Sequence, residues 1–311
     1  MTLLRIILAG LTFVLAAPAA AQAPAAPANL PPCFSDDVAA NGRLSSCSDI
    51  IEAPAMPEDV VAAALAVRAG LYADVDLTQK ALADLDASLK IKPRAAYTLG
   101  VRGSVLITLE RYPEALADLD AALKLEPEDA GLLFDRARAR SLTGDDAEAL
   151  ADLDKAGKIA PNSPAIPTAR GHIHAERHDW GSAIDEFDRA TKLSDNDAIA
   201  LNGSCWVRAQ AGRQLDLALE QCDRALTLED RNPDILDSRA FVRFRRNEYD
   251  KALADADAAL TIAPGRPETL YVRGMTKLRL GRQAEGEADL AAARAHKPDI
   301  DREYADYGVK P

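Results

Sequence analysis

The chain has 311 residues, of which 48% are hydrophobic and 28% charged, and its formal net charge is −12. This composition lies near the globular average and excludes a largely disordered protein. With 37 basic against 49 acidic residues, the chain lacks the basic surface that nucleic-acid binding requires. An anionic membrane surface is a poor partner for the same reason.

The first 21 residues have the pattern of a secretory signal peptide. Arg5 precedes the apolar run from Ile6 to Leu15, and a small-residue stretch ends at Ala21, where we expect cleavage. An uncleaved anchor is less favoured, because the run is shorter than the roughly 20 residues of a membrane span and Pro18 interrupts it. We therefore expect a periplasmic or secreted protein with no membrane attachment after signal removal.

Four cysteines follow, at Cys33, Cys47, Cys205 and Cys222. An even number in an exported chain favours disulfides, and the natural local pairs are Cys33 with Cys47 and Cys205 with Cys222. Buried free thiols are the alternative. The spacing has neither a CxxC pair nor a zinc-ligand pattern.

A short phrase of the form Ala-Leu-x-Leu/Ile recurs just before a proline or an aspartate. The marker residues are Pro93, Pro127, Pro161, Asp195, Asp230, Pro264 and Pro298, at intervals of 34, 34, 34, 35, 34 and 34 residues. The extra residue of the long unit lies near Gln214, in the predicted turn between its two helices. A fixed period of this length predicts a repeat architecture.

Three further positions in each unit carry small residues, as close helix crossing requires. They are Ala69, Gly103, Ala137, Gly171, Cys205, Ala240 and Gly274; then Ala81, Ala115, Ala149, Ala183, Ala218, Ala252 and Gly286; and then Ser88, Ala122, Ala156, Ala190, Ala225, Ala259 and Ala293. Gly144, Gly212 and Gly281 mark turns where a helix end needs positive φ. The period and these positions together resemble the tetratricopeptide repeat, a helix–turn–helix unit.

The resemblance implies an all-α, right-handed α-solenoid of about seven repeats, with an N-terminal half-repeat and a C-terminal capping helix. We expect a signal peptide at 1–21, an Ala/Pro-rich linker and start of a cap at 22–40, a half-repeat at 41–61, repeats at 62–95, 96–129, 130–163, 164–197, 198–232, 233–266 and 267–300, and a cap at 301–311. Gly286 is expected to weaken the second helix of the last repeat.

Charged residues also follow the period. Arginine occupies the seventh position of six repeats, as Arg68, Arg102, Arg136, Arg170, Arg239 and Arg273, whereas the fifth repeat has Ser204. The second helices carry matching acid pairs such as Asp118 with Asp120. A binding ladder and a structural ion-pair ladder both fit this pattern. The structural interpretation is favoured, because the seventh position lies away from the helix face that lines the groove in this family.

The groove face of the first helices supplies the candidate binding site. Its larger residues are Tyr97, Phe134, Arg138, His172, Glu176, Asn202, Trp206, Gln210, Phe241, Phe244, Arg245, Tyr271, Met275 and Arg279. Aromatic and arginine side chains are the usual anchors of protein interfaces. Because the aromatic residues cluster in 198–300, we expect the site there, binding an unidentified protein or peptide.

No sequence feature singles out an enzyme. His174 and His178 are spaced to share one helix face, but the glutamate between them is one place too late for HExxH, and structural use is favoured over a metal site. We expect no catalytic residues, cofactor or metal. The main hypothesis is a non-catalytic exported interaction scaffold. Two alternatives are a self-assembling envelope protein and a carbohydrate-binding module in which Trp206, Phe241 and Tyr271 stack on sugars.

Overall fold

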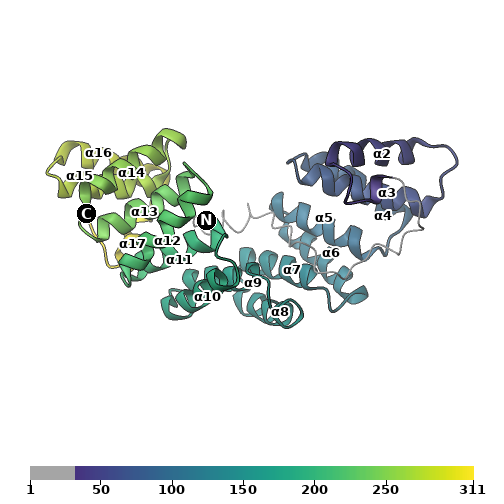
Figure 1. Ribbon diagram of the computed structural model, residues 1–311, viewed down its shortest axis with the longest axis horizontal. Coiled ribbons are helices and arrows are strands. Elements are labelled where there is room, and N and C mark those ends of the chain that lie inside the picture. Colours follow the sequence, from purple (N-terminus) through teal and green to yellow (C-terminus); the bar gives the residue numbers. More distant parts are fainter. Residues whose placement is uncertain (1–31) are drawn as a thin grey trace. The chain divides into compact units, whose positions relative to one another are not determined.

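The computed structural model describes residues 32–311, and the predicted signal peptide and most of the linker lie outside this range. The described residues form helices and no strand (Figure 1). The elements are η1 (Pro32–Phe34), α2 (Ala40–Glu52), α3 (Glu58–Ala73), α4 (Thr78–Ile91), α5 (Ala96–Thr108), α6 (Tyr112–Leu125), α7 (Ala130–Thr143), α8 (Asp146–Ile159), α9 (Ala165–Glu176), α10 (Trp180–Leu193), α11 (Ala198–Ala211), α12 (Leu215–Leu228), α13 (Pro233–Arg245), α14 (Tyr249–Ile262), α15 (Pro267–Arg279), α16 (Gln283–His296) and α17 (Ile300–Asp306).

The helices pair in chain order, as the period predicts. In the first compact unit, which ends at Ile166, α3 packs on α4, α5 on α6 and α7 on α8. In the second, Pro167–Pro311, α11 packs on α12, α13 on α14 and α15 on α16. The predicted all-α helical-repeat architecture is confirmed. Across the described residues, no helix combines the length and apolar character needed to cross a membrane.

Small residues allow the two helices of each pair to approach closely. A Cβ added to Gly103 would lie 2.7 Å from Leu119 Cγ, and one added to Gly171 would lie 2.9 Å from Phe187 Cε2. Real Cβ atoms do not approach so closely, so the partner's large side chain occupies the space that glycine leaves. The structure thus confirms the packing reason for small residues at these positions.

Gly286 is needed for close packing of α15 and α16, although glycine is a poor helix former. A Cβ at this residue would lie 2.7 Å from Leu278 Cδ2 and 2.9 Å from the carbonyl oxygen of Gly274 on the facing helix. Two glycines therefore face each other where α15 and α16 cross. Alanine is intrinsically the better helix former, but there is no room for its methyl group here.

Gly286→Ala should accordingly destabilise the chain by about 1–3 kcal/mol, because it overpacks this crossing. Gly157→Ala is the matched control: its Cβ would meet Ile166 Cγ2 at an ordinary 3.6 Å, and it should stabilise by up to about 1 kcal/mol. Urea unfolding followed by circular dichroism measures both. Equal stabilisation by the two alanines would show that the α15–α16 crossing can relax.

The turns within the helix pairs share one left-handed residue. Gly144, Gly212 and Gly281 have φ of 92°, 66° and 76°, as predicted. The corresponding turns elsewhere use Asp76, Glu110, His178 and Asn247, with φ of 58°, 58°, 58° and 62°. In the long repeat Gln214 is a second left-handed residue, at φ 50°, and accommodates the additional residue before α12.

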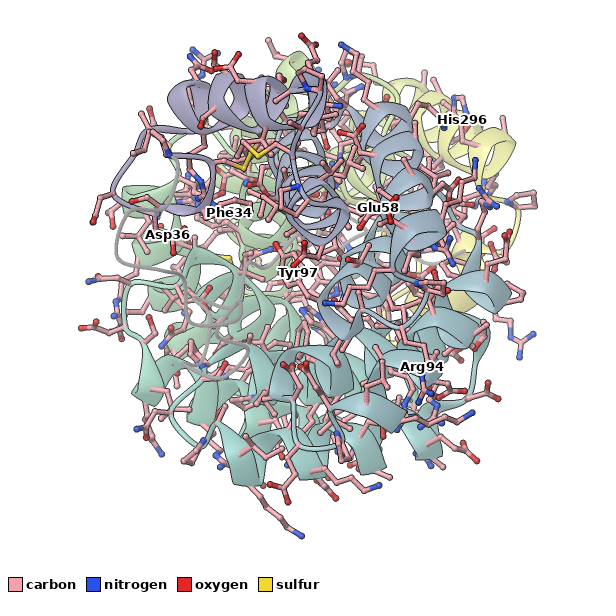
Figure 2. The ribbon with its side chains drawn as sticks, turned by 90° about the vertical axis from the view of Figure 1, so that its right-hand side faces the viewer. Phe34, Asp36, Glu58, Arg94, Tyr97 and His296 are labelled. Carbon is pink, nitrogen blue, oxygen red and sulfur yellow. A yellow bond between two sulfur atoms is a disulfide. The ribbon has the colours of Figure 1, made fainter. Side chains whose placement is uncertain are left out.

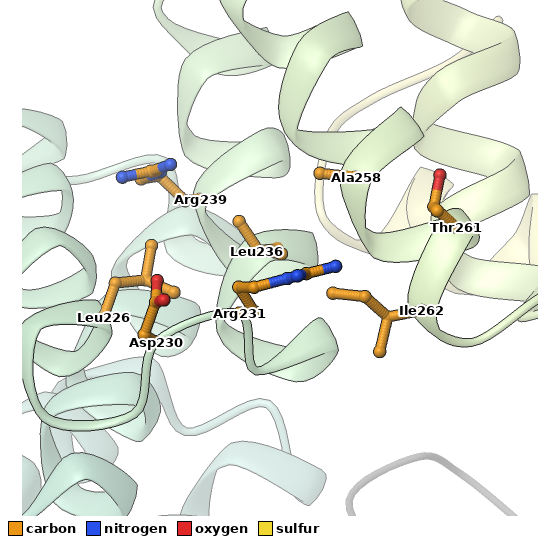
Figure 3. Close-up of a pocket in the computed structure, with 8 residues that line it drawn as sticks. All are labelled: Leu226, Asp230, Arg231, Leu236, Arg239, Ala258, Thr261 and Ile262. Carbon is orange, nitrogen blue, oxygen red and sulfur yellow. The ribbon is translucent and has the colours of Figure 1, made fainter.

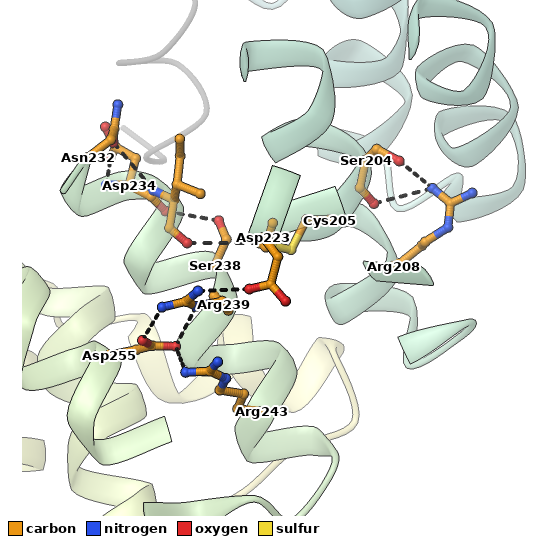
Figure 4. The surroundings of a disulfide bond; sticks show 12 residues. Ser204, Cys205, Arg208, Asp223, Asn232, Asp234, Ser238, Arg239, Arg243 and Asp255 are labelled. Atoms are coloured by element: carbon orange, nitrogen blue, oxygen red, sulfur yellow. Dashed lines mark hydrogen bonds and ion pairs between the residues drawn. A yellow bond between two sulfur atoms is a disulfide. The ribbon is translucent and has the colours of Figure 1, made fainter. Parts of the chain in front are cut away.

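The four cysteines form the two predicted pairs. Cys33 and Cys47 join η1 to α2, with sulfur atoms 2.15 Å apart. Cys205 and Cys222 join α11 to α12, with sulfur atoms 2.02 Å apart (Figure 4). All four are fully buried, and no cysteine of the described residues is free. Each bridge restrains a short loop, which stabilises a fold by roughly 3 kcal/mol.

Candidate functional site

The first unit holds three of the predicted groove residues. Tyr97 on α5 is 51% exposed (Figure 2). Phe134 and Arg138 on α7 are buried, and Arg138 Nη1 lies 3.1 Å from Asp135 Oδ1. Tyr97 is therefore the predicted residue of this unit that a partner can reach from solvent.

In the second unit the predicted aromatic residues come together. Trp206 on α11 lies 5.5 Å from Phe241 on α13, measured between ring centroids, and Phe241 lies 6.4 Å from Phe244. Equivalent positions of successive repeats stack above one another, so the first helices bring these rings into one row. Met275 on α15 and Gln210 on α11 are buried with them, whereas Asn202 is half-buried.

The C-terminal helix covers this row. Tyr304 on α17 lies 4.6 Å from Tyr271 on α15 and 5.3 Å from Phe241. Tyr307, just beyond the helix, lies 6.3 Å from both Trp206 and Phe241. Phe241 and Tyr271 consequently have no exposed surface, because residues of the chain's own terminus cover them.

Two predicted arginines bind the main chain of the terminal segment. Arg245 Nη1 donates to the carbonyl oxygen of Tyr307 at 2.7 Å, and Arg279 Nη2 donates to that of Lys310 at 3.1 Å. Their guanidinium groups also lie over rings, Arg245 at 5.7 Å from the Phe241 centroid and Arg279 at 5.9 Å from that of Phe244. The aromatic row and its arginines thus hold a piece of polypeptide.

Two acids lie buried on the same face. Asp237 on α13 and Glu268 on α15 are 1% and 3% exposed. Burial raises the pKa of Asp237 to about 7, although the nearby Arg266 opposes this shift. Glu268 Oε1 accepts a hydrogen bond from Lys297 Nζ at 2.9 Å. The terminal helix packs over this polar pair, since the hydroxyl of Tyr304 points at the Glu268 carbonyl.

His172 is a buried histidine with an unusual environment. It is 3% exposed, and its ring meets Phe187 edge to face at 5.0 Å. Within the described part of the chain neither ring nitrogen has a hydrogen-bond partner. Burial lowers its pKa from 6.5 to about 4, so the ring is neutral at physiological pH. Glu176, on the same helix, is half-buried.

Comparison with known proteins identifies the fold. No family model matches the chain, and no curated protein does. A tetratricopeptide repeat protein from Parabacteroides merdae has 18% identity and a TM-score of 0.60 over 80% of this chain and 99% of its own. The pilus biogenesis factor PilW has 18% identity and a TM-score of 0.58 over 65% and 94%. The chain has the tetratricopeptide-repeat fold.

A third solved structure extends the comparison. The APC/C hetero-tetramer Cut9–Hcn1 contains a chain with 13% identity and a TM-score of 0.70, matched over 86% of this chain. Only 52% of that longer chain is covered. At these identities the likeness concerns the tetratricopeptide-repeat fold itself.

The repeated arginines form a structural ladder. Arg102 donates to both carboxylate oxygens of Asp118 in its own repeat, at 2.6 and 2.8 Å, and to Asp86 of the preceding repeat at 2.9 Å. Arg136, Arg239 and Arg273 bind equivalent aspartates on both sides. These ion pairs join neighbouring tetratricopeptide repeats, in agreement with the structural interpretation over a binding ladder.

The repeat that lacks this arginine uses another. Ser204 stands at its seventh position, and Arg208, one turn later, is fully buried and donates to Asp188 of the preceding repeat at 2.6 Å. Arg208 also donates to Ser204 Oγ at 2.6 Å (Figure 4). Gln221 stands where the other repeats have the acid that pairs with their own arginine, such as Asp118. This repeat therefore lacks both the arginine at its seventh position and the acid that would pair with it.

Arg102→Met should lower stability by roughly 1–3 kcal/mol, because it leaves the largely buried Asp118 carboxylate without its bidentate partner. Binding of any groove ligand should be unaffected. Arg111→Met is the control, since Arg111 and Glu114 form an exposed pair whose loss should change the melting temperature little. Thermal unfolding compares the two; equal melting temperatures for both variants would contradict a structural role for the ladder.

The predicted histidine pair does not converge. His178 lies in the left-handed turn with φ 58°, and its ring meets Trp180 at 5.0 Å. His174 Nδ1 lies 3.3 Å from Asp179 Oδ2. Among residues 32–311, no cluster of three or more His, Cys, Asp or Glu side chains is placed to hold a metal ion.

A shallow pocket lies apart from the aromatic row, at the ends of α12, α13 and α14 (Figure 3). Its lining residues are Leu226, Asp230, Arg231, Leu236, Arg239, Ala258, Thr261 and Ile262. Arg239 already pairs with Asp223 and Asp255. A ligand here would therefore meet aliphatic side chains, the charged side chains of Asp230 and Arg231, and the guanidinium of Arg239, which is already engaged.

Sequence reasoning missed the residues that complete the site. Tyr304, Tyr307 and Trp180 all contact the aromatic row or each other, and Asp237 and Glu268 lie beneath. A usable signal was present: the chain is only 5% aromatic, yet two tyrosines lie three residues apart in its last eight. Such spacing places both rings on one helix face.

Proposed function

We propose that the chain is a non-catalytic, exported scaffold that binds a protein or peptide on the inner face of its first helices. One observation carries this proposal: the aromatic row and two arginines of the second unit hold a segment of polypeptide through ring contacts and main-chain hydrogen bonds. A surface that binds one helical segment in this way has the chemistry to bind another.

Export is supported by the sequence of residues 1–21 and by the two disulfides, which persist in oxidising compartments such as the periplasm. A structural relative also supports a protein partner, since Cut9–Hcn1 is described as a hetero-tetramer. The scaffold acts by presenting preformed anchors on packed repeats, without chemistry.

The test is affinity capture from envelope extract with mature protein, residues 22–311. Tyr97 and Arg279 are the predicted groove residues with the most exposed surface, so Tyr97→Ser with Arg279→Glu changes the face without disturbing the core. The matched control, Val75→Ser with Arg282→Glu, changes exposed turn residues. A partner that the wild type and the control retain and the groove variant loses supports the proposal.

The captured partner is then purified and its affinity for the three proteins is measured by calorimetry. Equal capture by the groove variant and the control would place binding elsewhere on the chain. Absence of any captured protein, combined with a mass that rises with concentration, would favour self-assembly instead.

A further inference from the structure

We propose that the groove of the second unit receives a short acidic helix of a partner protein, carrying tyrosines three residues apart, and that residues 300–311 occupy this place in the unbound chain. The inference rests on the proposed function and names the chemistry of its partner. The terminal segment would then be an intramolecular stand-in for the ligand, released when the partner's helix takes its place.

The segment differs from a simple cap in the reach of its side chains. The backbone of α17 packs on α15 and α16, the last pair, as a cap would. The rings of Tyr304 and Tyr307 also reach Phe241 on α13, Trp206 on α11 and Trp180 on α10. The two tyrosine rings therefore extend across the inner face of several repeats, as side chains of a bound peptide would.

The contacts define what the groove recognises. Tyr304 and Tyr307 are 0% and 8% exposed, so both rings enter the aromatic row. Arg245 binds the carbonyl oxygen of Tyr307, the C-cap residue of α17, where a helix leaves its last acceptors unsatisfied and carries partial negative charge. Arg279 binds the carbonyl oxygen of Lys310, in the non-helical residues that follow. Main-chain contacts of this kind are available to any helix followed by a short tail, and the rings supply the selectivity.

The amino-terminal half of the segment explains the acidic preference. Asp301 accepts hydrogen bonds from the Tyr271 hydroxyl at 2.9 Å and from Arg294 at 2.7 and 2.9 Å. Glu303 pairs with Lys297 and accepts a hydrogen bond from the Tyr307 hydroxyl. A partner helix with acids at these two places meets the same donors, whereas a basic helix would meet repulsion.

The segment is built to be exchanged. α17 has 7 residues, too few to be stable as an isolated helix. Asp301, Arg302, Asp306 and the last residues remain exposed to solvent. Its occupancy depends on attachment through the short link from α16, because tethering raises its effective concentration to the millimolar range. A partner helix that binds more tightly than this tethered segment displaces it.

The test uses a synthetic peptide of residues 298–311 and the full mature chain. The release variant, Tyr304→Ala with Tyr307→Ala, frees the groove while keeping every residue of the repeats. Arg302→Ala with Asp306→Ala is the matched control, because these two side chains of the same helix are exposed. The chain has two tryptophans, Trp180 and Trp206, and both contact Tyr307. Tryptophan fluorescence, excited at a wavelength where tyrosine does not absorb, therefore reports whether the groove is occupied.

The release variant should show altered tryptophan emission, and added peptide should restore the wild-type signal. Peptide affinity should be about tenfold or more higher for the release variant than for the wild type and the control, whose grooves are occupied. The peptide with both tyrosines changed to alanine should not bind. Circular dichroism and a count of free thiols verify that the release variant is folded.

A folded release variant that does not bind the peptide, or a wild type that binds it equally well, would overturn the inference. If the release variant is unfolded, the test is made on the wild type. Excess peptide should compete with the tethered segment and make that segment more accessible to protease. Unchanged protease accessibility would count against exchange. A wild-type mass that doubles with concentration at constant emission would show that a second copy is the occupant, and would also overturn it. In all these cases capture that depends on Tyr97 and Arg279 would still support the scaffold.

Discussion

Phe241→Ala should lower the free energy of unfolding of the second unit by about 3–5 kcal/mol, the cost of truncating a fully buried aromatic side chain. Phe241 has no exposed surface and contacts four other aromatic rings, those of Trp206, Phe244, Tyr304 and Tyr307. Its removal leaves a cavity between the repeats and the terminal segment, and it also removes the ring beneath Arg245. The segment should become accessible to protease in the folded protein.

Urea unfolding followed by tryptophan fluorescence isolates this effect, because both tryptophans lie in the second unit. Phe134→Ala is the matched control: Phe134 is 4% exposed but belongs to the first unit. It should lower stability by a similar amount in circular dichroism while the terminal segment stays protected. An unchanged tryptophan transition in Phe241→Ala would show that the aromatic row is not a packed core.

The sequence predicted the repeat frame well because that frame is local and periodic. The small residues and the arginine ladder recur every 34 residues or so, and both are explained by contacts within one repeat or between neighbours. The two cysteine pairs could be inferred for the same reason, since each joins elements adjacent in the chain. Residues at equivalent positions also predicted which rings would form one row.

The terminal segment could not be placed in this way. It occurs once, so no period positions it, and its contacts with Trp180, Trp206 and Phe241 reach back several repeats. The role of Gly286 was hidden for a related reason. Helix propensity describes a residue within its own helix, whereas the decisive neighbour, Gly274, lies on the facing one.

Two buried titratable groups of the second unit should give opposite pH dependences. Asp237 has a pKa raised from 3.8 to about 7, so folding favours its protonated form, and stability should fall as pH rises from about 4 to 7. His172 has a pKa lowered from 6.5 to about 4, so folding favours its neutral form, and stability should be lost as pH falls from 6.5 toward 4.

Each group contributes up to about 1.4 kcal/mol per pH unit and of the order of 3–4 kcal/mol in total. Between about pH 4 and 6.5 the two slopes oppose each other, and the wild type should show little net pH dependence from this pair. Asp237 is faced by Arg266, Asp234, Glu268 and Tyr304, and the like-charged acids add to the effect of burial. His172 faces Phe187, and burial is the cause of its lowered pKa.

Single substitutions should reveal the pH dependence of stability that each group contributes alone. Asp237→Asn should leave stability rising with pH between about 4 and 6.5, because His172 then acts alone; His172→Leu should leave it falling with pH up to about 7. The double variant should restore a flat profile. Urea unfolding across this pH range, followed by tryptophan fluorescence, gives each slope. Asp306→Asn and His296→Leu, at exposed positions of the same unit, are the matched controls. Slopes of the same sign in both single variants would contradict the assignment. Opposing linkage requires that Asp237 be buried in its protonated form and His172 in its deprotonated form.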